Sequence, residues 1–434
     1  MPPVEWSGIP GGSLRVVQKF GGSSVADAES IKRVAQRVVA TREKGREVVV
    51  VISAMGDATD ELLDLAKQVS PNPRPRELDM LLTTGERMSA ALLAMAINDL
   101  GHDARSLTGS QAGVITTGTH GDARIIDITP GRIVSALEDG DIVIVAGFQG
   151  VSQTTKDVTT LGRGASDTTA VALAAALGAA YCEIYSDVDG VYTADPRIVK
   201  AAKRIPQICY EEMLEMAAAG AKILHLRCVE YARRENVRVH VRSSFSEKPG
   251  TWVQDVPQRE DGMEQPLISG VAHDRSEAKI TVVGVPDKVG KAARIFDAIA
   301  RADINVDMIV QNVSHGSHGR TDISFTLSQD TGAVAIEVLE ATRAEVGFDE
   351  IIYNDAIGKV SVVGVGMRSH PGVTARFFAA LADAGVNIDM ISTSEIRISV
   401  VVGTDNVDKA VRAAHSAFGL DSDEAAIVYA GTGR

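Results

Sequence analysis

A segment of about thirty residues occurs twice in the last third of the chain. The first copy, KITVVGVPDKVGKAARIFDAIARADINVDMI, begins at Lys279, and the second, KVSVVGVGMRSHPGVTARFFAALADAGVNIDMI, begins at Lys359. Gly290 and Gly372 occupy matching positions in the two copies. Each copy predicts a strand, a turn that ends at glycine, a helix and a second strand, which together form a small sheet covered by helices on one face. Two such units are expected to pack against each other or against a partner chain.

Residues 14 to 250 instead alternate short apolar runs with amphipathic stretches. The runs LRVVQK and EVVVVISAM are typical of buried strands, and the helical pattern from Asp27 to Gly45 separates them. Further strands are expected within 104–109, 141–150, 181–187 and 238–244, and helices around 86–100, 166–178 and 211–220. This alternation predicts a mostly parallel sheet with helices on both faces, whose ligands bind beyond the carboxyl ends of the strands.

A polar stretch with three prolines, residues 246–266, separates these two parts and reads as a linker. We therefore expect an extension at residues 1–13, an α/β domain at 14–247, a linker at 248–266, and two repeat units at 267–348 and 349–434.

Charge and composition narrow the class of partner. The formal net charge of −13 argues against nucleic acid and anionic membrane, because those surfaces select basic proteins. The opening MPPVEWSGIPGGSL lacks the basic flank and apolar core of a signal peptide, and no long apolar run predicts a membrane span. Neither the cysteines nor the histidines show metal-ligand spacing, so no metal held by side chains is predicted. We expect a cytoplasmic protein.

The stretch KFGGSS, which begins at Lys19, ends the first predicted strand. It matches neither of the two common phosphate-binding loops. It has their physical ingredients, because glycines let the backbone approach an anion and the lysine adds a charge suited to phosphate. The alternative is a tight turn from strand to helix with a solvated lysine.

A second small-residue loop, LGRGASD, opens an alanine-rich helix at residues 161–167. Asp167 in the first helical turn is either a cap or part of a site. Arg163 between two glycines is suited to a bidentate grip on a carboxylate.

A third stretch, SDVDGVYTADPRI, carries three aspartates after a predicted strand. Their spacing does not match the calcium-loop pattern, and a hairpin or Asx-turn is the competing interpretation. Glu86 follows Gly85 at a predicted helix start, where it interacts with the helix dipole or receives an ammonium group. Lys222 in GAKILH is most often a surface residue in such a position.

Taken together, the motifs KFGGSSV, SAMGDATDELL, LLTTGER, FQGV, TTLGRGASDTTAVALAAALGA, EIYSDVDGVYTADPRIV and GAKILH occur in the order seen in aspartate kinases. The repeat resembles the paired ACT domains of the actinobacterial members of that family. The resemblance spans residue 14 to the end. It implies an αβα sandwich of the amino acid kinase fold, followed by two α+β ACT domains of βαββαβ type. It also implies transfer of the γ-phosphoryl group of ATP, with Mg²⁺, to the side chain of L-aspartate, the first step toward lysine, threonine, methionine and isoleucine.

The resemblance also implies roles for individual residues. The predicted catalytic residues are Lys19, Arg163 and Asp167. The predicted ATP-binding residues are Lys19, Phe20, Gly21, Gly22, Ser53, Ser166, Ser186, Asp187, Tyr192, Asp195, Arg197 and Lys222. The predicted aspartate-binding residues are Thr59, Glu86, Arg163, Gly164, Ala165 and Ser166, with Arg163 on the α-carboxylate and Glu86 on the ammonium group.

For the ACT domains the resemblance implies lysine and threonine as feedback effectors. The matching residues are Asp287, Gly290, Ala292, Gln311, Asn387 and Ile388 for threonine, and His370, Thr374, Ser394 and Glu395 for lysine. It further implies a homo-oligomer or an α2β2 assembly, whose small subunit starts internally near Met263.

Three features depart from the family pattern. Ala165 stands where a glycine is usual, so its methyl group either crowds the phosphoryl site or forbids a positive φ. Val289 replaces a proline, and His315, His318 and Arg320 enter the loop near the effector. Two alternatives therefore stay open: a regulatory amino-acid sensor that has lost transfer, and a kinase of glutamate or N-acetylglutamate. The four residues Lys19, Glu86, Arg163 and Asp167 argue against the sensor, and Glu86 argues against an N-acylated substrate.

Overall fold

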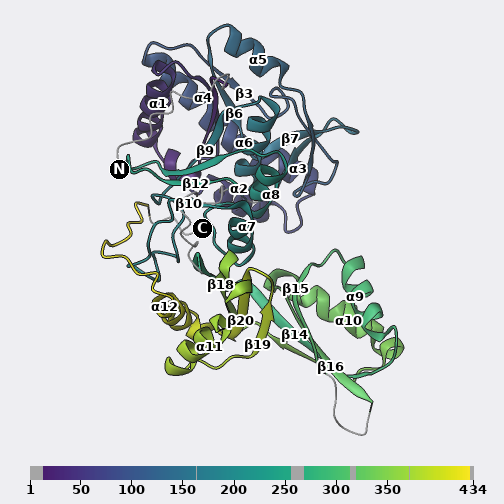
Figure 1. The fold of residues 1–434 in the computed structure, drawn as a ribbon. Coiled ribbons are helices and arrows are strands. Elements are labelled where there is room, and N and C mark those ends of the chain that lie inside the picture. Colours follow the sequence, from purple (N-terminus) through teal and green to yellow (C-terminus); the bar gives the residue numbers. More distant parts are fainter. Residues whose placement is uncertain (1–12, 163, 256–267, 313–318, 371, 431–434) are drawn as a thin grey trace.

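The computed structural model describes residues 13–430 except 163, 256–267, 313–318 and 371. The chain forms a larger α/β lobe followed by two small antiparallel sheets with their helices (Figure 1).

An eight-stranded sheet forms the centre of the larger lobe. Its order is β10 (Gln207–Ile208), β12 (Thr251–Val253), β11 (Val239–Ser243), β9 (Tyr181–Ser186), β1 (Arg15–Phe20), β2 (Glu47–Ile52), β6 (Ile142–Ala146) and β3 (Ala104–Leu107). The adjacent pairs are parallel except β11 with β12. The predicted mostly parallel sheet is therefore confirmed. Because β1, β2, β6 and β9 run the same way, their carboxyl ends lie along one edge.

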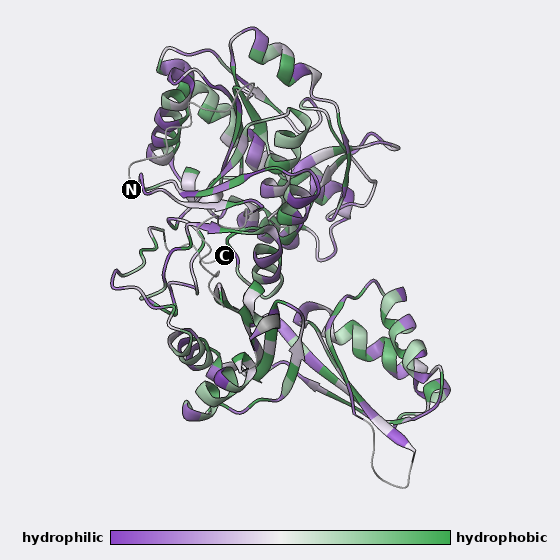
Figure 2. Ribbon diagram, viewed as in Figure 1, coloured by the Kyte–Doolittle hydropathy of each residue, from purple (hydrophilic) through white to green (hydrophobic). Residues whose placement is uncertain are grey.

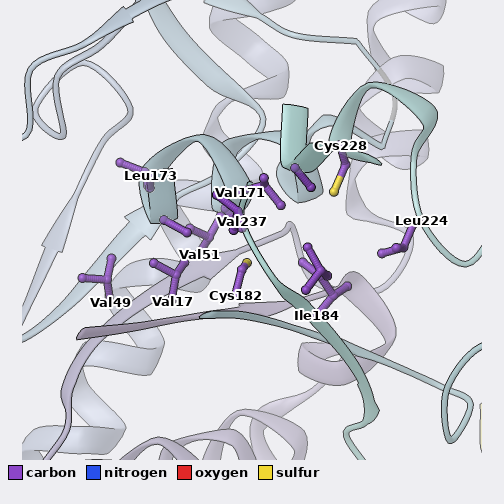
Figure 3. Close-up of a cluster of buried hydrophobic side chains, with 14 of the residues drawn as sticks. Val17, Val49, Val51, Val171, Leu173, Cys182, Ile184, Leu224, Cys228 and Val237 are labelled. Atoms are coloured by element: carbon purple, nitrogen blue, oxygen red, sulfur yellow. The ribbon is translucent and has the colours of Figure 1, made fainter. Parts of the chain in front are cut away.

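Alternate residues of the central strands face two different helical layers. Val48, Val50 and Ile52 of β2 pack with α1 (Ala28–Glu43) and α4 (Thr84–Asp99). Val49 and Val51 face the opposite cluster. That cluster is built on α5 (Gly131–Glu138), α6 (Ala165–Ala176), α7 (Tyr210–Ala218) and α8 (Leu226–Arg234). Figure 3 shows part of it, with Cys182 and Cys228 among the aliphatic side chains. The central strands therefore bury apolar residues on both faces, as a parallel sheet covered by helices requires, and they are largely green in Figure 2.

One predicted strand is two strands in the structure. Residues 141–150 contain β6, which ends at Ala146, and β7 (Gln149–Ser152), which belongs to a second sheet. That sheet has the order β5 (Ile125–Ile128), β4 (Val114–Thr116), β7 and β8 (Val158–Thr160). Phe148 makes the turn with a φ of 67°, a left-handed conformation that is rare outside glycine. An uninterrupted apolar run conceals such a break.

The helices α2 (Ala58–Val69) and α3 (Pro75–Leu82) pack against each other, and α3 also packs on β8. Together α3 and α4, Pro75–Asp99, form the one stretch among the described residues that is long and apolar enough to cross a membrane by length and composition. Half of its most apolar window is buried, and α4 packs on α1 and β3, as a core helix does.

The repeat forms two four-stranded sheets, each covered by two helices on one face. The first contains β15 (Val306–Asn312), β16 (Arg320–Ser328), β14 (Glu277–Pro286) and β17 (Glu350–Asn354), with α9 (Lys291–Arg301) and α10 (Gly332–Val346). The second contains β13 (Gly270–Asp274), β18 (Ile357–Val363), β20 (Arg397–Gly403) and β19 (Met390–Thr393), with α11 (Val373–Asp383) and α12 (Val407–Ala417).

The two sheets do not follow the boundary expected between residues 348 and 349. Strand β17 lies after that boundary but pairs with β14 in the first sheet, Lys279 opposite Asn354. Strand β13 precedes the whole first unit but pairs with β18 in the second sheet, Gly270 opposite Val363. The first unit is thus inserted into the second. Hydrogen-bonded edges, not adjacency in the chain, decide which sheet a strand joins, and sequence periodicity carries no signal for that choice.

Candidate active site

The centre of the candidate site is a buried ion pair. Lys19 lies near the end of β1, between Val51 of β2 and Ile184 of β9. Its Nζ is 2.5 Å from Oδ1 of Asp167, which lies in the first turn of α6. The structure therefore brings together a lysine and an aspartate that the sequence separates by about 150 residues. Burying two charges carries a large desolvation cost that packing does not offset, so such a pair is a candidate for a functional role.

The loops after β1 and β2 are bound to each other above this pair. The N–H of Gly56 donates to the carbonyl oxygen of Gly22 (3.1 Å), and the N–H of Ser53 donates to that of Phe20 (3.1 Å). A Cβ at Gly22 would lie 2.9 Å from the oxygen of Gly56 and 3.0 Å from that of Ala54, so only glycine fits. The short helix Gly22–Val25 follows Gly21 directly. Glycine backbone thus lines the edge at which a phosphate would be held.

The ring of Phe20 does not face the site. It is buried and stacks on Tyr185 with ring centroids 4.6 Å apart. Any contact of Phe20 with a ligand therefore comes from its backbone.

The loop before α6 owes its shape to two glycines. Gly162 and Gly164 have φ values of 86° and 74°, in the left-handed region. Arg163 between them lies outside the described residues. Ala165 begins α6 without a positive φ, and it is buried in a small apolar cluster with Phe148. Its methyl group is therefore compatible with this backbone, because position 165 does not need the positive φ that would favour glycine.

Ser166 lies against the turn that joins β6 to β7. A Cβ at Gly147 would come within 2.8 Å of the Ser166 hydroxyl oxygen, so a glycine is needed there. This contact ties the loop of Asp167 to the carboxyl end of β6.

Glu86 is a buried carboxylate at the start of α4. Its Oε1 accepts a hydrogen bond from the backbone N–H of Ala54 (3.2 Å). Its Oε2 is buried without a hydrogen-bond partner among the described residues. Burial raises the pKa of Glu86 to about 7, although the hydrogen bonds to backbone N–H groups oppose this. An unsatisfied buried carboxylate oxygen is suited to an ammonium group.

A cavity of about 220 Å³ lies where α2 and α3 face the loops that contain Phe148 and Gly162. It is lined by Thr59, Phe148 and Gly162 together with residues of α3. Asp79 on its wall accepts hydrogen bonds from the Thr160 hydroxyl and the Gly121 N–H, and its Oδ2 lies 2.6 Å from Nδ1 of His120. The sequence did not single out Phe148 or Asp79. Each lines the cavity only together with residues that are distant in the chain.

Beyond β9, the loop of residues 186–205 (the 186–205 loop) brings four predicted nucleotide residues together. Arg197 donates to Oδ2 of Asp187 (3.1 Å), and its backbone N–H donates to Oδ1 of Asp195 (2.8 Å). The Ser186 hydroxyl also donates to Asp187 (3.1 Å). The Asp195 contact is an Asx-type turn and Tyr192 bridges to Arg204, so the hairpin interpretation holds for this loop.

Two other predicted nucleotide residues, Tyr192 and Lys222, do not join this group of four. Tyr192 is almost fully buried in the core of the second ACT sheet, and burial raises its pKa to about 12. Lys222 is exposed in the turn between α7 and α8.

His225, which the sequence did not single out, is the N-cap residue of α8 and lies next to Gly164. A Cβ at Gly164 would lie 2.8 Å from Cδ2 of His225, so ring and glycine are in contact. Its Nδ1 is buried without a partner among the described residues, and burial lowers its pKa. The motif GAKILH contained this residue, but only the fold shows that it faces Gly164.

The predicted effector residues are divided between the two sheets. Asp287, Gly290, Ala292 and Gln311 belong to the first, and Val289 beside them is fully exposed. Arg320 binds the carbonyl oxygens of Gly284 and Gly347 and the carboxylate of Asp349, so it fastens β16 to neighbouring turns. The residues of the second sheet are mostly exposed: His370, Thr374, Asn387, Ile388, Ser394 and Glu395. His315 and His318 lie outside the described residues.

Comparison with known proteins agrees with this architecture. Residues 14–243 match the amino acid kinase family, and residues 280–342 and 360–418 match the ACT domain. The aspartokinase of Mycobacterium tuberculosis is 66% identical over 96% of this chain and 99% of its own length.

Two crystal structures of E. coli aspartokinase III are also similar. The complex with aspartate and ADP (R-state) is 27% identical with a TM-score of 0.78, covering 93% of this chain and 99% of its own. The complex with lysine and aspartate (T-state) is 28% identical with a TM-score of 0.69 at the same coverage.

Proposed function

The chain belongs to the aspartokinases of the amino acid kinase family, as its motifs predict, and from this we propose that it phosphorylates L-aspartate. The reaction transfers the γ-phosphoryl group of ATP to the side-chain carboxylate, giving 4-phospho-L-aspartate and ADP. It is the first step toward lysine, threonine, methionine and isoleucine. The observation that carries the proposal is the buried Lys19–Asp167 pair at the edge of the glycine loops.

The substrate is held by groups of opposite charge. Glu86 takes the α-ammonium group through its unpartnered Oε2, and Thr59 and Ser166 add hydrogen bonds. Arg163, whose position is not described, takes the α-carboxylate. The cavity beside Phe148 and Gly162 accommodates the rest of the amino acid.

The transferred group lies between Lys19 and the backbone of Gly21 and Gly22. The aspartate side chain is ionised at neutral pH, so its oxygen attacks the γ-phosphorus without a general base. The bond to the β–γ bridging oxygen breaks and ADP leaves with the electron pair. Lys19 neutralises charge on the equatorial oxygens, and Asp167 keeps its ammonium group in place. Positioning and electrostatic stabilisation therefore supply most of the rate.

ATP binds toward the 186–205 loop, with Ser53, Ser186, Asp187, Tyr192, Asp195, Arg197 and Lys222 as its predicted contacts. Mg²⁺, when bound with ATP, would supply additional positive charge at the phosphates. Such an ion needs only one or two carboxylates from the protein. Asp167, in the first turn of α6 beside Lys19, and Asp187, directly after β9, would be the carboxylates that hold it.

Feedback regulation by lysine and threonine is proposed for the ACT sheets. The lysine complex of E. coli aspartokinase III supports it. The structure is more similar to the R-state complex with aspartate and ADP (TM-score 0.78) than to the T-state complex with lysine (0.69), and we propose on this basis that its lobes have the R-state arrangement, taken here as the active state. The assembly proposed is a homo-oligomer or an α2β2 form with a small subunit that starts near Met263, a residue outside the described part. A single full-length band from the native gene would contradict the internal start.

The function is tested by incubating the enzyme with ATP, Mg²⁺ and L-aspartate and trapping the acyl phosphate with hydroxylamine. Aspartyl hydroxamate is expected with the wild type and with Lys32→Met, which alters an exposed lysine of α1. Lys19→Met should form none. A wild-type enzyme that binds threonine but forms no hydroxamate would favour the sensor alternative.

A further inference from the structure

The last described residues of the chain, 420–430, leave α12 and run across the 186–205 loop; we call them the C-terminal strap. The strap makes two isolated antiparallel bridges to this loop, Val428 to Val188 and Asp421 to Ala202. The two elements are therefore joined at both ends of the strap, although more than 200 residues separate them in the chain.

Backbone hydrogen bonds fill the distance between these bridges. The N–H of Ser422 donates to the oxygen of Ala201 (2.8 Å), and the N–H of Ala426 donates to that of Lys200 (2.8 Å). At the far end, the N–H of Tyr429 donates to the carbonyl oxygen of Asp187 (2.9 Å). The strap thus reaches the residue whose carboxylate holds Arg197.

Tyr429 adds the side-chain contacts. Its hydroxyl donates to Oδ2 of Asp189 (3.3 Å), and its ring stacks on Phe245 with centroids 6.0 Å apart. Asp189 is buried and also accepts from Ser246 (2.5 Å) and Lys248 (3.0 Å). One carboxylate therefore connects the loop after β9, the loop after β11 and the strap.

The same loop shares a core with the second ACT sheet. Val188, Tyr192, Ala194, Val199 and Ala202 belong to one apolar cluster with residues of β13, β18, β20, α11 and α12. Leu420, Ala426 and Val428 of the strap pack against this same cluster, so the 186–205 loop contacts both the regulatory sheet and the strap. A loop packed in this way takes its conformation from both partners.

We propose that the C-terminal strap is a positioning element of the nucleotide site, and that Tyr429, through Asp189 and the Asp187 carbonyl, holds Asp187 and Arg197 where ATP binds. The inference rests on the proposed function, because that proposal assigns this loop to ATP. The new element is that the C-terminal strap influences the affinity for nucleotide although it contacts neither ATP nor aspartate.

The size of the effect follows from the contacts that Tyr429 makes. A hydrogen bond to a charged acceptor and an aromatic stack each stabilise the docked loop modestly. Their loss lowers the population of the competent loop and hence the apparent affinity for nucleotide, on the order of tenfold. Aspartate binds on the other side of Lys19, where the strap makes no described contact, so its affinity is expected to stay the same.

The experiment uses the full-length enzyme and three variants. Tyr429→Ala removes hydroxyl and ring, and Tyr429→Phe keeps the stack but removes the hydrogen bond. Ile427→Ala is the matched control, because Ile427 lies two residues earlier in the strap with its side chain 44% exposed. For each we would measure the KM for ATP, the KM for aspartate, kcat, and ADP binding by calorimetry.

Tyr429→Ala should raise the KM for ATP and weaken ADP binding about tenfold, with the KM for aspartate unchanged. Tyr429→Phe should show a smaller shift in the same direction, and Ile427→Ala none. Equal shifts in both KM values, or wild-type ADP affinity in Tyr429→Ala and Tyr429→Phe, would overturn the strap's role while leaving the kinase intact. Tight ADP binding by a wild type that forms no hydroxamate would overturn the reaction and leave the strap testable by calorimetry alone. A wild type that binds no ADP would overturn both proposals.

Discussion

Lys19 and Asp167 form an ion pair at 2.5 Å although each side chain is only 2% exposed. Because both side chains are shielded from solvent, their attraction offsets part of the cost of burying the two charges. In the proposed reaction the phosphoryl group adds negative charge beside Lys19, and the pair becomes a triad of alternating charges. The site is therefore arranged for a ligand charge that the protein alone does not supply.

This arrangement predicts that removing both charges restores part of the stability lost in the single variants but does not restore activity. Lys19→Met or Asp167→Asn alone leaves an uncompensated buried polar partner and should lower the free energy of unfolding by roughly 3–5 kcal/mol. The double variant should regain part of that loss, because both charges are gone. Its hydroxamate formation should stay at least about a thousandfold below wild type. Urea denaturation and the hydroxylamine assay measure the two quantities. Additive stability losses would show that the pair is not coupled.

Glu86 predicts how the reaction depends on pH. Because burial raises the pKa of its carboxyl group to about 7, the free enzyme is half protonated there. Only the ionised form attracts the ammonium group of aspartate. The value of kcat/KM for aspartate should therefore rise with pH up to about 7 and level off above it.

The variant Glu86→Gln should lose this inflection and raise the KM for aspartate by about ten- to a hundredfold. Glu138→Gln, which alters an exposed glutamate at the end of α5, is the control. The raised pKa also means that ionised Glu86 costs stability, increasingly so as pH rises from about 4.5 to 7. The variant should accordingly match the wild type in stability at low pH and exceed it at pH 8. An unchanged pH profile would remove Glu86 from the substrate site.

The position of Ala165 predicts that its replacement by glycine changes the free energy of unfolding but not kcat. Its methyl group is buried among apolar residues, and the residue needs no positive φ. Ala165→Gly should therefore lower the free energy of unfolding by about 1 kcal/mol, through lost burial and added backbone freedom. The kcat should change by less than about twofold. A large increase in kcat would mean that the methyl group does crowd the phosphoryl group.

The catalytic sheet was predictable because its strands are long apolar runs separated by amphipathic helices. The residues Lys19, Asp167 and Glu86 could be chosen because each follows a strand or opens a helix beside glycine. The parallel order of the strands predicts that Lys19 lies at the ligand edge of the sheet. Its pairing with Asp167 could not be predicted in this way, because α6 follows β8 of the second sheet.

Other contacts had no local signal. Strand β13 pairs with β18 of the second ACT sheet, and β17 pairs with β14 of the first. Sequence periodicity does not encode such long-range pairing. The left-handed turn at Phe148 lies within an apolar run. Asp189 is one of the three aspartates that the sequence marks in this loop, but nothing in the sequence indicates that Tyr429, 240 residues later, is its partner.

Arg397 predicts how the regulatory sheets and the catalytic lobe are coupled. From β20 its guanidinium binds Oε2 of Glu215 on α7 at 3.2 Å and lies 3.8 Å from Oδ1 of Asp307 on β15. One side chain thus joins both ACT sheets to the helix that leads toward Lys222 and His225. Because we assign this arrangement to the active state, the contact stabilises that state relative to the inhibited one.

Arg397→Met should shift the equilibrium toward the inhibited state, since it removes a contact made in the active one. A coupling of about 1 kcal/mol would lower the concentration of lysine plus threonine for half-inhibition by about fivefold. The kcat without effectors should fall only slightly, because the active state still predominates there. Arg412→Met, which changes an exposed arginine of α12, controls for lost charge. If Arg397→Met instead becomes resistant to the effectors, the contact belongs to the inhibited state, and the assignment of this arrangement to the active state must be reversed.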